Sequence, residues 1–166
     1  MHFKTYIIGL FVLALSALSI SCENKHADTR KVFQKSFITH VSEDNLPIIN
    51  FSVKGKRTLF IVDTGSDINV INQKIYDTRT GDFEITDSVM LTVNTISGKY
   101  NKNTYIVGVN LDDSIYTNFY VMDISSIIYD TYVKQHIIVD GIVGVNFLHK
   151  NGVIVNFKNK TFYNND

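Results

Sequence analysis

A single short segment constrains this chain more than any other, because it places an acid at the tip of an apolar strand. The apolar run 59–62 leads directly into Asp63, Thr64, Gly65 and Ser66. Gly65 permits a tight backbone path beside the carboxylate, and the neighbouring hydroxyl groups can fix the orientation of that carboxylate. The same residue types also form ordinary polar turns. The segment therefore predicts either acid–base chemistry at the end of a buried strand or a plain turn.

A second glycine-containing segment lies later in the chain. The run 137–143 is mostly β-branched and apolar, with a bend at 140–141, and it leads to Gly144. The residues that follow predict a short helix, which the Asn-Gly pair at 151–152 can end. This pattern favours a strand that passes through a glycine bend into a helix.

On these two segments the chain resembles the retropepsin-like aspartic proteases, a single-domain family that includes retroviral proteases and bacterial relatives. In that family an Asp-Thr-Gly loop pairs with a downstream element of two apolar residues and a glycine, which Ile142, Val143 and Gly144 match. The resemblance covers roughly residues 36–163, including a closing hairpin at 153–163. It implies a mainly β fold, namely a single-lobe closed β-barrel with one short helix near the C-terminus.

Residue patterns along the chain agree with a mainly β fold. Alternating or continuous apolar runs predict strands at 32–41, 47–53, 58–62, 89–93, 105–111 and 119–123. A short strand and a helical turn are expected over 69–76, whereas the path of 124–132 is not predicted. By position, the turn that holds Ser97, Gly98 and Tyr100 resembles the flap that closes over bound peptide in the family. A plain exposed hairpin explains these three residues equally well.

The first residues form a separate unit. Lys4 precedes an apolar stretch over 6–20, and a site of small residues ends at Cys22, the only cysteine. This pattern resembles a bacterial lipoprotein signal, although Ser19 stands where such signals carry leucine. We expect 1–21 to be the signal peptide and Cys22 to carry the lipid. The alternatives are an ordinary cleaved secretory signal or an uncleaved anchor, for which the stretch is shorter than the ~20 residues of a bilayer span.

This organisation predicts three parts and a location. After the signal, the polar segment 22–35 is expected to act as a tether, or simply as a frayed terminus, and 36–166 to form the protease domain. The protein is expected in the bacterial cell envelope, anchored to a membrane through the lipid. A secreted or periplasmic soluble protein is the alternative.

Composition limits the partners. A chain of 166 residues with 45% hydrophobic residues suits one domain of ordinary size. Sixteen basic and sixteen acidic residues balance, without a block of like charge, so a nucleic-acid partner is not expected. The sequence contains no phosphate-binding loop, and its five histidines are scattered, so no metal or organic cofactor is predicted.

Counting the motifs decides the expected assembly. Peptide hydrolysis by paired acids needs two carboxylates that share a proton, and the chain holds one Asp-Thr-Gly. The resemblance implies a homodimer in which Asp63 meets its symmetry mate and activates water to cut a peptide or protein substrate. It also implies that Thr64 makes contacts between the subunits and that Ser66 donates to the outer oxygen of Asp63. Gly65 and Gly144 would supply unobstructed backbone.

Other acids and other functions stay open at this point. Asp67 is expected on the surface, and Asp140 is expected to cap the bend before Gly141 rather than to act in catalysis. The alternative function is a catalytically inactive, lipid-anchored binding or assembly module on the same fold. A β-barrel lipoprotein that binds carbohydrate or lipid is a third possibility, for which the nine tyrosines show no obvious platform.

Overall fold

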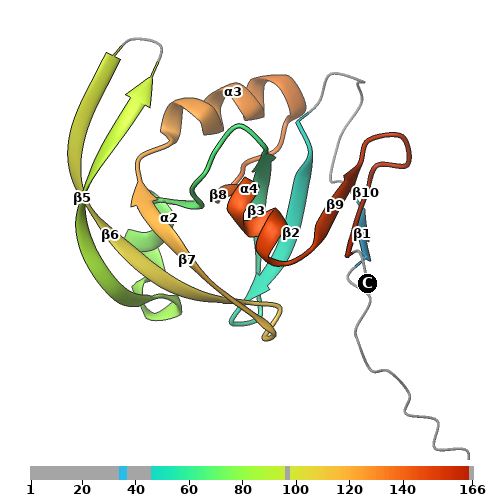
Figure 1. The fold of residues 1–166 in the computed structure, drawn as a ribbon, viewed down its shortest axis with the longest axis horizontal. Helices are drawn as coiled ribbons and strands as arrows, with labels where there is room; N and C mark the ends of the chain where they lie inside the picture. The colour runs from blue at the N-terminus through green and yellow to red at the C-terminus, as the bar shows by residue number, and fades with distance from the viewer. Residues whose placement is uncertain (1–33, 37–45, 96–97, 165–166) are drawn as a thin grey trace, which may run out of the picture. The chain divides into compact units, whose positions relative to one another are not determined.

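The computed structural model describes residues 34–36, 46–95 and 98–164 (Figure 1). These residues belong to the second of two compact units into which the chain divides, 1–31 and 32–166. The predicted signal peptide, Cys22 and the tether up to residue 33 lie outside the described residues. No helix in the described part has the length and apolar character needed to cross a membrane.

The described residues form two β-sheets with three α-helices and one 3-10 turn. The strands are β1 (Gln34–Ser36), β2 (Ile48–Val53), β3 (Lys56–Asp63), β4 (Val70–Asn72), β5 (Glu84–Thr95), β6 (Gly98–Leu111), β7 (Ile115–Met122), β8 (Gly141–Gly144), β9 (Val153–Asn156) and β10 (Thr161–Asn164). The helices are α2 (Gln73–Thr78), α3 (Ser125–Gln135) and α4 (Val145–Lys150), with the 3-10 turn η1 at Thr80–Asp82. The predicted mainly β class is therefore confirmed.

The larger sheet contains seven strands in the order β2-β3-β8-β4-β7-β6-β5. Most neighbours are antiparallel, but β3 pairs with β8 and β4 pairs with β7 in parallel. The strands at the two ends of this order, β2 and β5, do not pair with each other in the described part of the chain. The predicted closed barrel is therefore wrong, because the sheet stays open.

The smaller sheet joins the two ends of the described chain. β10 lies between β1 and β9 and pairs with both in antiparallel fashion. The predicted closing hairpin is thus present. Of the predicted strand at 32–41, residues 34–36 form β1, and the others lie outside the described residues. Both edges of β10 are occupied within one chain.

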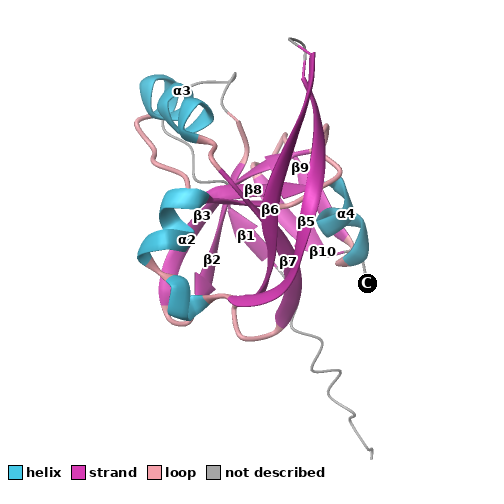
Figure 2. Ribbon diagram, turned by 90° about the vertical axis from the view of Figure 1, so that its left-hand side faces the viewer, coloured by secondary structure: helices cyan, strands magenta, loops and turns pink. Residues whose placement is uncertain are grey.

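The long β5–β6 hairpin lies where the sequence predicts either a flap or a plain exposed hairpin. Its strands pair from Glu84 with Gly108 to Thr95 with Gly98, and Figure 2 shows the hairpin extending beyond the other strands. Ser97 lies outside the described residues. Gly98 and Tyr100 belong to β6, and the side chain of Tyr100 is not described.

Helices account for the main difference from the prediction. The helix expected near the C-terminus is α4, and the expected helical turn after 72 is α2. The connection over 124–132, whose path was not predicted, leads into α3. The sequence does not reveal this helix, because its buried residues are polar and do not form an apolar stripe. The buried side chains of α3 are Thr131 and Gln135, whereas Tyr129, Tyr132 and Val133 are exposed.

The core lies on both faces of β3. Phe60 and Val62 belong to the larger buried cluster, and Ile61 between them belongs to a second cluster beneath α3. Successive residues of a strand point to opposite faces. The continuous apolar run therefore indicated a covered central strand correctly, and this strand carries Asp63 at its end.

Candidate active site

Asp63 is the last residue of β3 and lies beside Gly144, the last residue of β8. The two strands run parallel, with Val62 opposite Val143 and Asp63 opposite Gly144. Asp63 is exposed, whereas both residues of the apolar pair that precedes Gly144, Ile142 and Val143, are buried. The structure therefore brings the two predicted motifs side by side and leaves the carboxylate accessible.

The turn after β3 orients the Asp63 carboxylate through the backbone. The Gly65 N–H donates to Asp63 Oδ1 at 2.9 Å, and the Ser66 N–H donates to the Asp63 carbonyl oxygen at 3.3 Å. A Cβ atom at Gly65 would lie 3.3 Å from Asp63 Oδ1 and would crowd this contact. Thr64 is exposed on the same turn.

Ser66 supports the loop in a different way from the one predicted. Its hydroxyl donates to the Ile68 carbonyl at 2.9 Å and accepts a longer bond from the Ile68 N–H at 3.4 Å. A hydroxyl has a single proton to donate. The expected donation from Ser66 to Asp63 is therefore absent from this chain, and Ser66 instead stabilises the turn that follows the motif.

Gly144 is required by the close approach of the loop. A Cβ atom at this position would lie 2.6 Å from the Ile68 carbonyl oxygen and closer still to that of Ser66. Both are backbone atoms, which cannot move away independently of the chain. The next residue, Val145, donates its N–H to the Ser66 carbonyl at 2.8 Å. Gly144 thus allows the start of α4 to bind the Asp63 loop directly.

Asn69 joins three parts of the site, and the sequence analysis missed it. Its Oδ1 accepts the Gly144 N–H at 3.0 Å, and its Nδ2 donates to the Asn118 carbonyl at 3.0 Å and to Thr117 Oγ1 at 3.4 Å. Its own carbonyl accepts the Tyr120 N–H at 2.9 Å. Asn69 is buried. The sign of this role in the sequence is a single amide side chain between Ile68 and Val70 in a mostly apolar run.

Asp67 lies on the surface, as predicted. The side chain is exposed, and the backbone carbonyl accepts a hydrogen bond from Asn146 Nδ2 at 2.7 Å. Asn146 is the second residue of α4, so this bond adds a further link between the loop and the helix. Asn146 was also missed by the sequence analysis.

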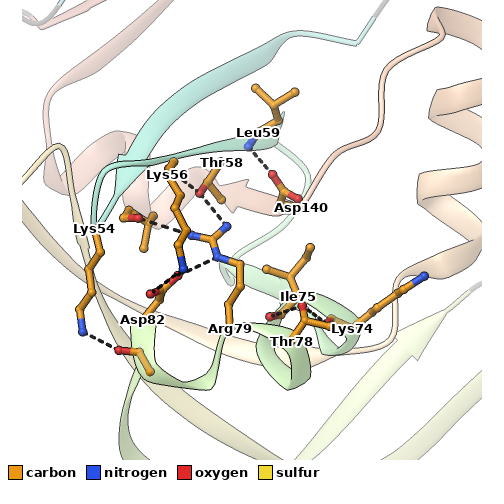
Figure 3. A network of polar contacts seen from close by, with 12 residues as sticks. Lys54, Lys56, Thr58, Leu59, Lys74, Ile75, Thr78, Arg79, Asp82 and Asp140 are labelled. Carbon is orange, nitrogen blue, oxygen red and sulfur yellow. Dashed lines mark hydrogen bonds and ion pairs between the residues drawn. The ribbon is translucent and has the colours of Figure 1, made fainter.

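Asp140 binds the backbone of β3 rather than capping the bend before Gly141. Its Oδ2 accepts the Leu59 N–H at 2.8 Å (Figure 3), and its own N–H donates to the Leu59 carbonyl at 2.7 Å. Burial raises the pKa of the Asp140 carboxyl above its ordinary value, and the hydrogen bond from Leu59 and the charge of Arg79 oppose that rise. The position of this carboxylate indicates a structural role.

A charged cluster fixes the beginning of β3. Arg79 Nε donates to Asp82 Oδ2 at 2.8 Å, and Lys56 Nζ lies 2.9 Å from the same oxygen (Figure 3). Arg79 also donates to Thr58 Oγ1 at 3.2 Å. The hydrogen bond from Arg79, followed by that from Lys56, lowers the pKa of Asp82 below its ordinary value. This cluster ties η1 to the strand that ends in Asp63.

In the described ranges, no group of three or more His, Cys, Asp or Glu side chains is placed to hold a metal ion. The site therefore consists of one exposed carboxylate and a backbone framework. A single exposed carboxylate of this kind can supply one acid or base.

Comparisons with known proteins bear on this geometry. The sequence matches the family model of the retroviral aspartyl proteases over residues 43–156, a range that contains both Asp63 and Gly144. No curated protein matches the sequence. Among solved structures, the chain is similar to the crystal structure of the retroviral protease-like domain of Ddi1 from Leishmania major. That similarity has a TM-score of 0.42 and 14% sequence identity, and covers 69% of this chain and 83% of that chain.

Proposed function

Because this chain belongs to the retroviral aspartyl protease family, we propose that it is an aspartic endopeptidase that acts as a homodimer. The observation that supports this proposal is the exposed Asp63 carboxylate at the end of β3, held beside Gly144. The substrate is a peptide or protein in extended conformation, bound between the β5–β6 hairpin and the Asp63 loop.

In the proposed mechanism two Asp63 carboxylates share one proton. The ionised carboxylate takes a proton from water, whose oxygen attacks the peptide carbonyl carbon, while the protonated carboxyl donates to the carbonyl oxygen. Collapse of the tetrahedral species breaks the C–N bond, and the departing amine receives a proton from the dyad. The two apparent pKa values belong to the pair rather than to either residue.

A partner from within the same chain is disfavoured by distance. Asp140 is held at Leu59, which lies four residues before Asp63 on β3. At about 3.3 Å per residue, this places the Asp140 carboxylate about 13 Å along the strand from Asp63. Two carboxylates must lie within hydrogen-bonding distance to share a proton. Asp140 is therefore too far from Asp63 to share its proton, and in the proposal the second acid comes from a second copy.

The smaller sheet limits how two copies can pair. Since β10 already has β1 and β9 as neighbours, strand addition by a second copy is left to the outer edges of those two strands. A two-fold axis would bring identical surfaces together, and the exposed Thr64 would lie near the partner loop. Thr64 would then make the contacts between subunits that the family resemblance implies.

We also propose that the protein is exported to the cell envelope and anchored through a lipid on Cys22. This proposal depends on the sequence pattern of the first 22 residues. Replacing Cys22→Ala should move the protein from the membrane fraction to the soluble fraction after cell disruption. An ordinary secretory signal would instead give the same soluble distribution for both forms.

The central experiment is cleavage of a peptide library by the full chain. Asp63→Asn should lower turnover by at least about a hundredfold, because it removes the general acid–base pair. Asp67→Asn is the matched control, since it changes an exposed neighbouring acid. Light scattering should give twice the chain mass for all three proteins. Turnover that survives in Asp63→Asn would refute the mechanism, and a wild-type monomer without turnover would instead favour an inactive binding module.

A further inference from the structure

The two edge strands of the larger sheet, β2 and β5, differ in how their outer edges are covered. On β2, the Ser52 N–H donates to Asp112 Oδ1 at 2.7 Å, and the Ser52 carbonyl accepts the Asp112 N–H at 2.8 Å. Lys35 Nζ donates to the Asn50 carbonyl on the same edge. Charged side chains that bind the backbone of an edge strand keep other strands from pairing with it. The outer edge of β2 is therefore closed to strand addition.

No described strand pairs with the outer edge of β5, which forms the margin of the sheet in Figure 1. This strand has 12 residues. Its residues 88–95 include no charged side chain and no proline, and Met90 is 69% exposed. Charges, proline or short length usually protect natural edge strands. A long, uncharged and exposed edge strand is instead a template for another strand.

The strand registers show which backbone groups of β6 point toward β5. The Tyr120 N–H donates to the Asn69 carbonyl at 2.9 Å, so the backbone of Tyr120 points away from β6. Its neighbour Phe119 therefore points to β6, where it lies opposite Val107. Successive residues of a strand direct their backbone groups to opposite edges. Counting back along β6 from Val107, the backbone of Thr104 points to β5.

The same alternation identifies the free groups of β5. Val89 lies opposite Thr104, so its backbone bonds to β6. The described residues of β5 after the bulge whose backbone groups point away from β6 are Ser88, Met90, Thr92 and Asn94. The Ser88 N–H donates to Asp87 Oδ1 at 2.7 Å, which agrees with this direction. The β5 edge, defined as the outer backbone groups of residues 88–94, thus begins at the Ser88 carbonyl.

A second copy of the chain fits the β5 edge because the edge is complementary to itself. Its free groups are centred on Leu91, so a two-fold axis beside Leu91 pairs all of them with the other copy in antiparallel register. Met90 then lies opposite Thr92 of the other copy, and Ser88 lies opposite Asn94. The resulting ladder contains about six main-chain hydrogen bonds.

Charge favours the same partner. Like charges do not face each other in this register, because residues 88–95 are uncharged. Asp87 comes opposite Thr95 of the other copy, which pairs with Gly98 in its own hairpin. Lys99 follows Gly98, so an acid of one copy lies near a lysine position of the other at each end of the ladder. A peptide of unrelated sequence offers no such match.

We propose that the β5 edge is a self-association surface, through which two copies of the chain join by antiparallel strand pairing centred on Leu91. The paired hairpins form one continuous sheet across the two-fold axis. This contact is separate from the meeting of two Asp63 carboxylates, so it does not rest on the proposed protease activity. A chain that pairs through β5 but shows no turnover would refute the protease and leave this inference intact.

The test is disulfide cross-linking of the full chain, carrying Cys22→Ala so that the introduced cysteine is the only one. Leu91→Cys places two cysteines opposite each other at a non-hydrogen-bonded pair, where the Cα atoms lie about 4.5 Å apart, within disulfide range. Val89→Cys is the matched control, because residue 89 of each copy lies about 13 Å from its mate along the strands. With copper phenanthroline as oxidant, Leu91→Cys should give at least about tenfold more covalent dimer than Val89→Cys.

A second pair of variants tests the main-chain bonds. Met90→Pro removes an outward N–H but keeps the ladder to β6, whereas Met90→Thr removes the same exposed side chain and keeps the N–H. The average mass from light scattering should rise with concentration for the wild type and Met90→Thr, across about a hundredfold range, and should stay constant for Met90→Pro. Circular dichroism checks that each variant folds, and if Met90→Pro does not, the two cysteine variants still decide.

Three outcomes would overturn the proposal. The first is equal cross-linking at positions 89 and 91, and the second is no cross-linking at position 91. The third is protection of the Met90 and Thr92 amides from hydrogen exchange only when a peptide substrate is added, which would assign the β5 edge to substrate rather than to a second copy.

Discussion

Replacing Asn69→Ala should destabilise the fold because it removes the bonds that join β8 to β7. The Gly144 N–H would lose its acceptor at 3.0 Å, and the Asn118 carbonyl would lose its donor at 3.0 Å. Gly144 is buried, so water cannot readily replace the amide. The third bond, to Thr117 Oγ1 at 3.4 Å, is longer and contributes less.

The expected cost follows from these two groups. An unsatisfied buried N–H costs about 1–3 kcal/mol, and loss of an ordinary hydrogen bond costs about 0.5–1.5 kcal/mol. Together they predict a decrease of about 1.5–4.5 kcal/mol in the free energy of unfolding. That is a large part of the 5–15 kcal/mol typical of a domain. Turnover should also fall, since Gly144 borders the Asp63 loop.

The measurement is urea unfolding followed by far-ultraviolet circular dichroism, since the chain contains no tryptophan. All proteins are compared at one concentration, because association would add to apparent stability. Asn118→Ala is the matched control: it removes an exposed side chain but keeps the carbonyl that Asn69 binds, so a change within about 0.5 kcal/mol is expected. A loss below about 0.5 kcal/mol for Asn69→Ala would refute the reasoning.

Three further variants test the framework around the site. Gly144→Ala should cost about 1–3 kcal/mol or more, because its Cβ would overlap two backbone carbonyl oxygens; unchanged thermal stability would contradict this. Asp140→Asn keeps an acceptor for the Leu59 N–H. Because burial raises the pKa of Asp140, the wild type should lose stability relative to this variant as pH rises above about 4. A difference in urea midpoints that does not change with pH would contradict this prediction. Asp82→Asn should lower stability at pH 7, because the hydrogen bond from Arg79 lowers the pKa of Asp82. This loss of stability should shrink as pH falls below 3.8, the ordinary pKa of an aspartate. A constant loss down to pH 2 would argue against the ion pair.

The central strands could be predicted because the order of apolar and polar residues in each strand matches the burial of its side chains in the sheet. In β2 the side chains of Ile49, Phe51 and Val53 are buried, whereas Asn50 and Ser52 between them are partly exposed. This alternation is the pattern of a strand with one covered face. The continuous apolar run in β3 similarly predicted that side chains on both faces of this strand are buried. Asp63 was identified because polar residues follow that run directly.

Other features depend on contacts between distant segments and leave little trace in the sequence. The path of α3 was not predicted, because Thr131 and Gln135 are its buried residues and its aromatic residues face outward. Ser66 was expected to donate to Asp63, whereas its hydroxyl donates to the Ile68 carbonyl, a contact that residue types alone do not specify. Asn69 reads as an ordinary polar residue until β7 and β8 are brought beside it. The closed barrel failed because barrel closure depends on strand pairing that local patterns do not specify.

The hydrogen bonds around the site divide between two tasks. Asn69, Ser66 and Asn146 hold the backbone on either side of the motif, whereas the Asp63 carboxylate receives one hydrogen bond, from Gly65, within the described residues. Preorganised backbone around an accessible carboxylate is what catalysis by a shared proton requires. Asn69→Ala should therefore lower both the free energy of unfolding and turnover. Asp63→Asn should lower turnover with little change in stability, because asparagine keeps an acceptor for the Gly65 N–H.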